Sequence, residues 1–200
     1  YDYLTSPNYT GLAPVQSIIT DQTLGLGTFD RLDGELVMVG GVAYRVGTDG
    51  IPQPISSTAS TPFFEAIRFQ PDVSGPVAPG TTCANLQTAV NTLATTDTGV
   101  VAVRVRGTFN DLVTRSVQAQ NTPYPSLAEA VAKQTVFPLG SRRAVLVGFR
   151  TGADFAGIGA AGLHLHGITA DRTAGGHVLS CVAGADVQLS VQRAAGFRVS

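Results

Sequence analysis

Residues 162–179, GLHLHGITADRTAGGHVL, hold all three histidines of the chain and constrain its fold more than any other segment. His164 and His166 lie two residues apart in an apolar run, and side chains two apart on a β-strand point to the same face. Residues 171–176 carry turn chemistry, with one aspartate and two glycines. The segment therefore predicts an antiparallel hairpin with two histidines on the first strand and His177 on the second.

Strand parity decides whether the three imidazoles meet. Opposed residues of an antiparallel pair share a face, so His177 joins the other two only if it opposes an even-numbered residue such as His166. This register centres the turn between Asp171 and Arg172. Three converging imidazoles form the ligand set of a catalytic zinc with an open fourth position. The alternative is three unrelated core or surface histidines, and the gathering of a rare residue into one hairpin favours the metal site.

Composition limits the class of protein. With 200 residues, a hydrophobic fraction of 44% and a mean hydropathy of +0.18, the chain fits one globular domain or two closely packed halves. A net charge of −1 gives no electrostatic basis for binding nucleic acid. No apolar run reaches the ~18 residues that a membrane span needs. We therefore expect neither a nucleic-acid partner nor a membrane partner.

The two cysteines and the ends of the chain bear on its compartment. Cys83 and Cys181 lie far apart and make no disulfide framework, so we expect free buried thiols. The chain begins at Tyr1 rather than at Met, and we expect that preceding residues were removed by processing or lie outside this sequence. The sequon at Asn8 and the scarcity of charge leave the compartment open, with secretion slightly favoured over the cytoplasm.

The first hundred residues predict mostly strands. A three-strand meander is expected over residues 24–46, with turns at Asp33-Gly34 and Gly40-Gly41, and a further strand over residues 63–69. Prolines predict a loop at residues 48–55 and a connector at residues 71–79. Residues 83–95 carry apolar side chains at the i, i+3, i+4, i+7 spacing of an amphipathic helix.

The second half predicts long alternating strands around one more helix. Strands are expected at residues 100–109, continuing past a bend near Gly107, and at residues 144–150 and 185–194. Ser126 followed by Glu129 is a capping box, which predicts a short helix.

Regular βαβ alternation is missing, so the order favours an α+β fold with mixed or antiparallel sheets and a few short helices. We expect a single catalytic unit over residues 1–200. It would be built from two packed β-rich halves, 1–122 and 123–200, with the metal site on the second half.

Several polar residues are candidates for chemistry beside the histidines. Glu35 directly follows the Asp33-Gly34 turn, and it is either a functional acid or a solvated carboxylate at a strand edge. Arg104 and Arg106 share one face of a strand, most simply the solvent face. Arg115, in LVTRSV, could hold a substrate carboxylate with two hydrogen bonds. The sequence alone does not choose among the three arginines.

Four segments resemble the acetolactate decarboxylase family and follow one another in the family's order. They are LGTFDRLDGELVMVGGVAYRVGTDG at 26–50, GTF with TRSV within 107–117, PYPSLAEAV at 123–131, and GIGAAGLHLHGITADRTAGGHVL at 157–179. The LDGE turn together with the HxH and GGH motifs is a specific combination.

The resemblance implies a ligand set and a reaction. His164, His166 and His177 would bind zinc, although an imidazole site also accepts other divalent transition metals. The resemblance implies a homodimer of two-part subunits built from packed mixed sheets. It further implies the conversion of 2-acetolactate to acetoin and carbon dioxide, a step of acetoin and butanediol metabolism.

It also implies that Glu35 and Arg115 are polar catalytic residues and that Thr28 contributes a hydroxyl. The mechanism we predict has zinc chelating the hydroxyl and ketone oxygens of the substrate and stabilising an enediolate. Arg115 would hold the departing carboxylate, and Glu35 would manage the hydroxyl proton. No organic cofactor is expected, because the substrate's ketone is the electron sink.

Two positions depart from the family pattern. Gly167 follows the HxH motif where the family has a bulky aromatic residue, so we expect that strand to be widened or loosened. The family also has an active-site glutamate in a C-terminal tail, whereas this sequence ends at Ser200 and its only carboxylate after His177 is Asp186. The tail lies outside this sequence, or the protein completes its site differently; both remain open.

Two other classes of protein share part of the histidine pattern. A non-catalytic regulatory or DNA-associated domain of the plant- and prokaryote-conserved type also has a histidine-rich strand followed by GGH, but it is shorter and lacks the LDGE turn. A cupin-like metal barrel uses an HxH strand with a glutamate a few residues on and a distant histidine. His177 is too close for that arrangement.

Overall fold

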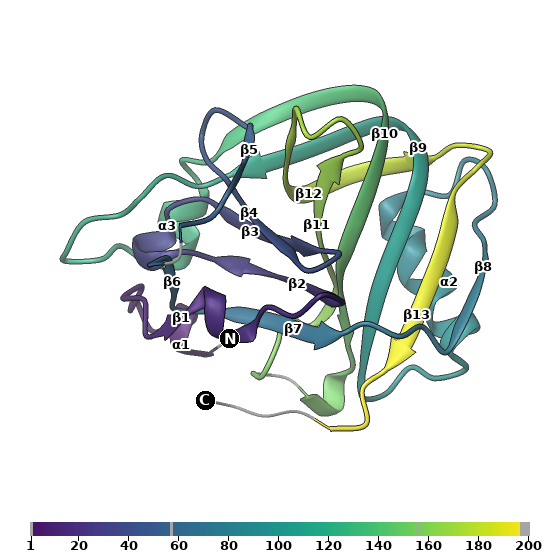
Figure 1. Ribbon diagram of the computed structural model, residues 1–200, viewed down its shortest axis with the longest axis horizontal. Coiled ribbons are helices and arrows are strands. Elements are labelled where there is room, and N and C mark those ends of the chain that lie inside the picture. Colours follow the sequence, from purple (N-terminus) through teal and green to yellow (C-terminus); the bar gives the residue numbers. More distant parts are fainter. Residues whose placement is uncertain (1, 57, 156, 197–200) are drawn as a thin grey trace.

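A computed structural model describes residues 2–56, 58–155 and 157–196. Within them, two β-sheets and one helix form three layers, with the larger sheet in the middle (Figure 1). The smaller sheet has the order β5-β4-β3-β2-β7, and the larger has the order β10-β11-β12-β9-β13-β8, with β9 also pairing with β10. All strand pairs of these two sheets are antiparallel in the described part. The predicted class, sheet-dominated with few short helices, is confirmed.

The five-stranded sheet contains the predicted meander. Its strands are β2 (Thr23–Thr28), β3 (Glu35–Val39), β4 (Val42–Val46), β5 (Pro52–Pro54) and β7 (Phe64–Arg68). A separate pair joins β1 (Ala13–Pro14) to β6 (Ser60–Thr61). The loop predicted at residues 48–55 is wrong at β5. That strand lies at the edge of the sheet, where a proline's missing N–H does not interrupt the pairing.

The six-stranded sheet holds the longest strands. Its members are β8 (Val73–Pro76), β9 (Val100–Ser116), β10 (Thr135–Thr151), β11 (Gly162–Thr169), β12 (Gly175–Ala183) and β13 (Gln188–Arg193). The connector predicted at 71–79 is wrong at β8, which is again an edge strand. The first part of β10 was not predicted from the sequence. A shift of register between Pro138 and Gly140 interrupts the alternation of buried and exposed side chains there.

The helices are short, and side chains cap the N-termini of α2 and α3. They are α1 (Asp2–Thr5), α2 (Cys83–Ala94) and α3 (Leu127–Val131), with 3₁₀ turns at Val15–Ile18, Asp30–Leu32 and Ala153–Phe155. The predicted capping box of α3 is present, since the Ser126 side chain accepts from the Glu129 backbone and the Glu129 side chain accepts from the Ser126 backbone. None of the helices in the described residues is long and apolar enough to cross a membrane.

Both faces of the six-stranded sheet are packed. One face meets α2 through a core that includes Leu86, Val90, Val101, Val103, Val105 and Leu165. The opposite face meets the five-stranded sheet through Leu24, Leu26, Val37, Ala102, Val147 and Ile168. Because side chains alternate along β11, its leucines at 163 and 165 face α2, and its even-numbered residues face the other sheet.

A disulfide joins Cys83, at the start of α2, to Cys181 in β12, with a Cα–Cα distance of 5.0 Å. The prediction of free thiols is therefore wrong. The two cysteines are 98 residues apart in sequence, but α2 packs against the strand that carries Cys181. Separation along the chain does not limit proximity once a helix covers a sheet.

Along the chain, the strands pass from the five-stranded sheet to the six-stranded sheet between β7 and β8. Residue 122, the predicted boundary between two halves, lies between β9 and β10. Strand β9 pairs with β10, β12 and β13 in one sheet. The division into halves at residue 122 stays a prediction.

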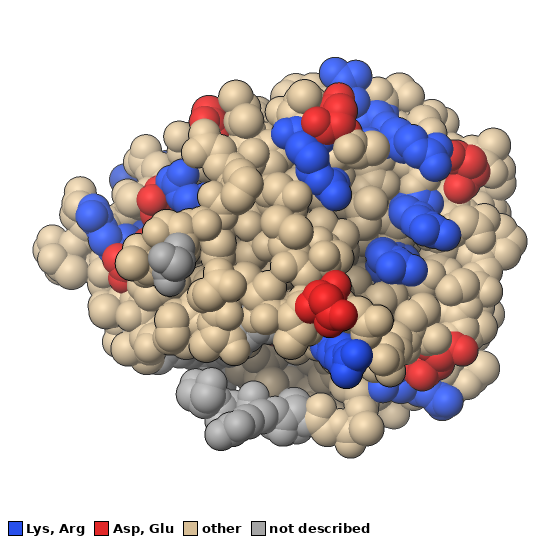
Figure 2. Space-filling view, viewed as in Figure 1, with Lys and Arg blue, Asp and Glu red and all other residues tan. Residues whose placement is uncertain are grey.

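Charge is sparse on the surface. Figure 2 shows a mostly uncharged face, with basic side chains gathered over the half that holds β9, β13 and β8. Arg106 is exposed, as predicted, whereas Arg104 is half-buried with its guanidinium 5.0 Å from the centre of the Phe69 ring.

Candidate metal centre and active site

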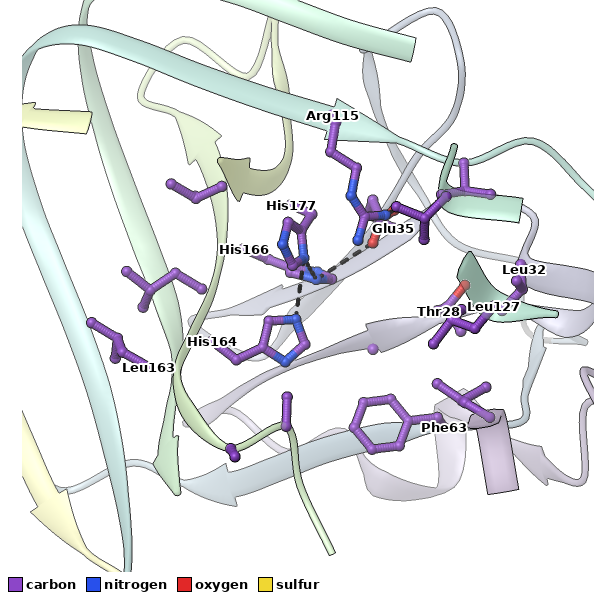
Figure 3. Close-up of a pocket in the computed structure, with 18 residues that line it drawn as sticks. Thr28, Leu32, Glu35, Phe63, Arg115, Leu127, Leu163, His164, His166 and His177 are labelled. Carbon is purple, nitrogen blue, oxygen red and sulfur yellow. Dashed lines mark hydrogen bonds and ion pairs between the residues drawn. The ribbon is translucent and has the colours of Figure 1, made fainter. Parts of the chain in front are cut away.

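The three histidines meet on the face of the six-stranded sheet that points toward the five-stranded sheet (Figure 3). His166 opposes His177 in the β11–β12 pair, which is a register that brings His177 to the same face as the other two imidazoles. On its other side, His177 opposes Arg115 of β9. Three neighbouring strands therefore carry His166, His177 and Arg115 in one row, and His164 lies two residues along β11.

The ring nitrogens are spaced like metal ligands. His177 Nδ1 lies 3.2 Å from His164 Nε2 and 3.3 Å from His166 Nε2. A tetrahedral zinc ion with Zn–N bonds of 2.0–2.1 Å places two ligand nitrogens roughly 3.3 Å apart. His166 Nδ1 lies 2.8 Å from the Leu36 carbonyl oxygen, which can only accept, so Nδ1 carries the hydrogen and Nε2 keeps a free lone pair.

The histidines are also in the right protonation state. Burial, together with the charge of Arg115, lowers the pKa of His164 to about 4. Burial likewise holds the pKa values of His166 and His177 well below the ordinary value. All three imidazoles are therefore neutral at neutral pH, as metal ligation requires. The donor set, spacing and charge state together fit a divalent transition metal.

Glu35 and Arg115 meet beside the histidines, although they come from different sheets. Glu35 Oε1 pairs with Arg115 Nη1, and Glu35 Oε2 lies 3.4 Å from His166 Nε2. Since a carboxylate oxygen and the lone pair of Nε2 are both acceptors, a proton or a cation shared between them would stabilise this approach. Burial raises the pKa of Glu35, against the opposing charge of Arg115 and a hydrogen bond from the Val117 backbone. Glu35 is only 4% exposed, so it is not a solvated edge carboxylate.

Two hydrogen bonds between the layers bring this pair together. The Gly34 N–H of the LDGE turn donates to the Val117 carbonyl at 3.1 Å, just beyond β9. The Ser116 hydroxyl donates to the Val46 carbonyl at 2.8 Å. The end of β9 that carries Arg115 is therefore fastened to the turn that carries Glu35.

All the predicted site residues line one pocket of about 370 Å³. They are Thr28, Glu35, Arg115, His164, His166 and His177. The Thr28 hydroxyl donates its hydrogen to the Gly34 carbonyl at 2.9 Å, so it can offer a ligand only its lone pairs. The opposite wall is apolar and includes Leu4, Leu32, Phe63, Val117, Leu127 and Val131. Leu32, Phe63 and Leu127 are labelled beside Thr28 in Figure 3.

The structure places the residues at both departures from the family pattern, Gly167 and Asp186. Gly167 stays paired with Leu146 on one side and Gly176 on the other, so the expected loosening of β11 is wrong. The Leu146 side chain occupies the space, because a β-carbon at position 167 would stand 2.6 Å from Leu146 Cδ2. Asp186 binds Arg143 at 2.5 Å and the Thr108 N–H at 2.7 Å, outside the pocket.

Sequence reasoning missed a second acid beside the histidines, the partly buried Glu65 of β7. Its Oε2 lies 3.9 Å from His164 Nδ1, and burial raises the pKa of Glu65 to about 7. The available signal was a single acid inside an apolar strand, FFEAIRF. The alternation of that strand did not show which of its faces would meet the histidines.

The chain is similar to known proteins along most of its length. The sequence profile of the alpha-acetolactate decarboxylase family matches residues 1–200. The alpha-acetolactate decarboxylase of Methanosarcina mazei is 38% identical over 171 residues, which cover 86% of this chain and 59% of that protein. The one of Bacillus subtilis is 35% identical over 158 residues, which cover 79% of this chain and 62% of that protein.

This chain thus spans about three fifths of the length of those two curated relatives. The crystal structure of alpha-acetolactate decarboxylase from Bacillus subtilis strain 168, 32% identical, superposes with a TM-score of 0.88 over 96% of this chain and 82% of that chain. By its sequence and its fold, the protein belongs to the alpha-acetolactate decarboxylase family.

Proposed function

We propose that this protein converts 2-acetolactate to acetoin and carbon dioxide at a zinc ion held by His164, His166 and His177. The observation that carries the proposal is the buried Glu35–Arg115 pair beside three converging, neutral imidazoles in one pocket. The names of the relatives support the substrate. When bound, the zinc ion supplies a Lewis acid for the neighbouring hydroxyl and ketone oxygens of the substrate.

In the proposed reaction, Arg115 binds the substrate carboxylate. Its Nη1 pairs with Glu35, while its Nε is buried without a hydrogen-bond partner among the described residues. The guanidinium therefore has a donor free to face an anion in the pocket. As the bond to the carboxylate carbon breaks, carbon dioxide leaves and the electron pair passes into the adjacent ketone. No organic cofactor is needed, because that ketone accepts the electrons.

Glu35 handles protons in this proposal. Its Oε2 faces His166 Nε2 on the pocket side, and burial favours its protonated form. The carboxyl group can exchange a proton with the substrate hydroxyl. It can then deliver one proton to the carbon that lost carbon dioxide, which completes acetoin. The apolar wall around Phe63 and Leu127 excludes water that would protonate that carbon without steric control.

Carbon dioxide release from acetolactate, measured together with zinc content, tests the proposal. We expect the wild-type protein to carry about one zinc per chain and to release carbon dioxide. Arg115→Ala should keep the zinc but lose activity by roughly a hundred-fold or more, because an electrostatic contact to the reacting group is gone. His177→Ala should lose zinc and activity together.

Arg106→Ala is the matched control, because Arg106 lies on the same strand but is exposed. It should behave like the wild type. A metallated wild type that releases no carbon dioxide from acetolactate would reject the proposed reaction, and an active, fully metallated His177→Ala would reject the ligand set. The homodimer remains a prediction, and size measurement of the purified protein addresses it.

A further inference from the structure

Three buried polar atoms lie behind the histidines without a hydrogen-bond partner in the described part of the chain. They are Glu65 Oε2, His164 Nδ1 and Thr151 Oγ1. Buried polar atoms are nearly always paired, so each such atom calls for an explanation. Two of the three, Glu65 Oε2 and His164 Nδ1, are 3.9 Å apart.

The orientation of the His164 ring places its Nδ1 on the side of Glu65 and its Nε2 on the side of the metal centre. Its Nε2 faces the other histidines, 3.2 Å from His177 Nδ1, so its Nδ1 points away from the metal centre and toward Glu65. A histidine that binds a metal through one nitrogen usually donates the hydrogen of the other to a carboxylate or a carbonyl. His166 already follows this rule through the Leu36 carbonyl.

Both outer partners come from the five-stranded sheet. Leu36 lies on β3 and Glu65 on β7, the two strands that flank β2. The ligands themselves lie on β11 of the six-stranded sheet. One layer therefore carries the imidazoles of β11, and the layer packed against it offers an acceptor to each of them.

Gly159 leaves the Glu65 carboxylate little freedom. A β-carbon at position 159 would stand 2.5 Å from Glu65 Oε1 and 2.9 Å from Thr151 Oγ1. The segment between β10 and β11 thus closes directly over the carboxylate and has no room for a side chain. A confined carboxylate can hold a ring in one orientation, which a solvated one cannot.

We propose that Glu65 is a positioning residue of the metal centre, accepting the Nδ1 hydrogen of His164 so that the Nε2 lone pair faces the metal. The inference rests on the proposed metal site. It requires the two atoms to approach by about 1 Å when the metal binds, to reach hydrogen-bond distance. The carboxylate then also makes His164 a more basic ligand.

Metal affinity tests the proposal without reference to turnover. Glu65→Gln keeps the size and shape of the side chain but replaces the carboxylate with a weaker, neutral acceptor. We expect it to bind Zn²⁺ about ten-fold more weakly in competition with a chelator, and Glu65→Leu, which has no acceptor, up to about a hundred-fold more weakly. The visible spectrum of the Co²⁺-loaded protein should change in both variants, because the geometry of His164 changes.

Thr151→Val is the matched control. It removes a polar atom from the same buried space without changing its volume, so its Zn²⁺ affinity and Co²⁺ spectrum should match the wild type. A Glu65→Gln variant that binds Zn²⁺ within two-fold of the wild type overturns the proposal. So does a Thr151→Val variant that loses as much affinity as Glu65→Gln, because the effect would then come from packing.

These outcomes are separable from those of the proposed function. A wild type that binds Zn²⁺ but leaves acetolactate intact rejects the reaction and leaves the role of Glu65 standing. An active wild type whose Glu65→Gln variant binds Zn²⁺ unchanged rejects the role of Glu65 alone.

Discussion

At the scale of single residues, the site combines groups with different protonation demands within a few ångströms. The three imidazoles are kept neutral by burial and by the nearby charge of Arg115. The same burial raises the pKa of Glu35, although the ion pair with Arg115 opposes that rise. The positive charge of Arg115 therefore lowers the pKa values of the histidines and of Glu35 alike. It disfavours the charged form of the imidazoles and favours the charged form of the carboxyl group.

Glu35→Gln should separate proton handling from metal binding. The amide keeps the shape of the side chain but cannot exchange a proton, so kcat should fall by about a hundred-fold or more. Zinc content should stay unchanged, because the three imidazoles are intact. Steady-state kinetics with metal analysis measures both quantities. Glu129→Gln is the control, since glutamine also completes a capping box and the position is exposed; a Glu35→Gln variant with wild-type kcat would remove Glu35 from the reaction.

Gly176 allows β12 to lie against β9 next to His177. Its φ is +130°, and a β-carbon there would collide with the Arg115 carbonyl oxygen. Gly176→Ala should lower the free energy of unfolding by about 1–3 kcal/mol and weaken metal binding, because backbone strain shifts the next residue. Denaturant unfolding and chelator competition measure the two effects.

Gly40→Ala separates strain from collision. Gly40 also has a positive φ, +60°, but nothing stands within 4 Å of its added β-carbon. That variant should lose only about 1–2 kcal/mol from conformation and bind metal normally. Equal metal binding by the two variants would contradict the role given to Gly176.

At the scale of elements, the histidine hairpin depends on its closing turn. The Asp171 carboxylate accepts from the hydroxyls of Thr169 at 2.6 Å and Thr173 at 2.8 Å, and from the Thr173 N–H at 3.2 Å. These hydrogen bonds lower the pKa of Asp171 to about 2. The turn thereby fixes the register that opposes His166 to His177.

Asp171→Asn should be less stable than the wild type in a way that depends on pH. Because the folded-state pKa lies below the unfolded value of 3.8, the charged carboxylate stabilises the folded state above about pH 4. This contribution should disappear as the pH falls from about 4 to about 2. Thermal unfolding of the metal-free proteins across that range measures it. A difference between the two proteins that persists unchanged at pH 2 would contradict the assignment.

At the scale of the whole molecule, the disulfide ties the helix layer to the strand that carries His177. Cys181 lies four positions beyond His177 on β12, and Cys83 opens α2. In the unfolded chain the bond closes a loop across a sequence separation of 98 residues, which restricts that ensemble strongly.

Replacing both cysteines with alanine should therefore lower the free energy of unfolding by about 2–5 kcal/mol. Zinc stoichiometry should remain that of the wild type, because the hairpin register does not depend on the bond. Denaturant unfolding without reductant gives the first quantity and metal analysis the second. Two titratable thiols in the unreduced, unfolded wild type would show that the bond does not form.

Much of the site was predictable because its signals are local. The side-chain period of a strand predicted that the three imidazoles meet only if His177 opposes an even-numbered residue such as His166, and the structure has that register. The capping box of α3 and the apolar stripe of α2 were equally local. The pairing of Glu35 with Arg115 was not visible in any local pattern; only family resemblance brought those two residues into one site before the structure joined them.

The tertiary structure alone decided the contacts between layers. Glu65 and His164 lie on different sheets, and nothing in FFEAIRF specifies which strand its acid will face. The Cys83–Cys181 bond depends on the packing of α2 over β12, and the edge strands β5 and β8 depend on a neighbour that pairs with them. Periodicity and turn chemistry act between residues close in sequence, so the sequence by itself determined the histidine hairpin. What surrounds that hairpin depends on how two sheets stack, and stacking is set by burial summed over the whole chain.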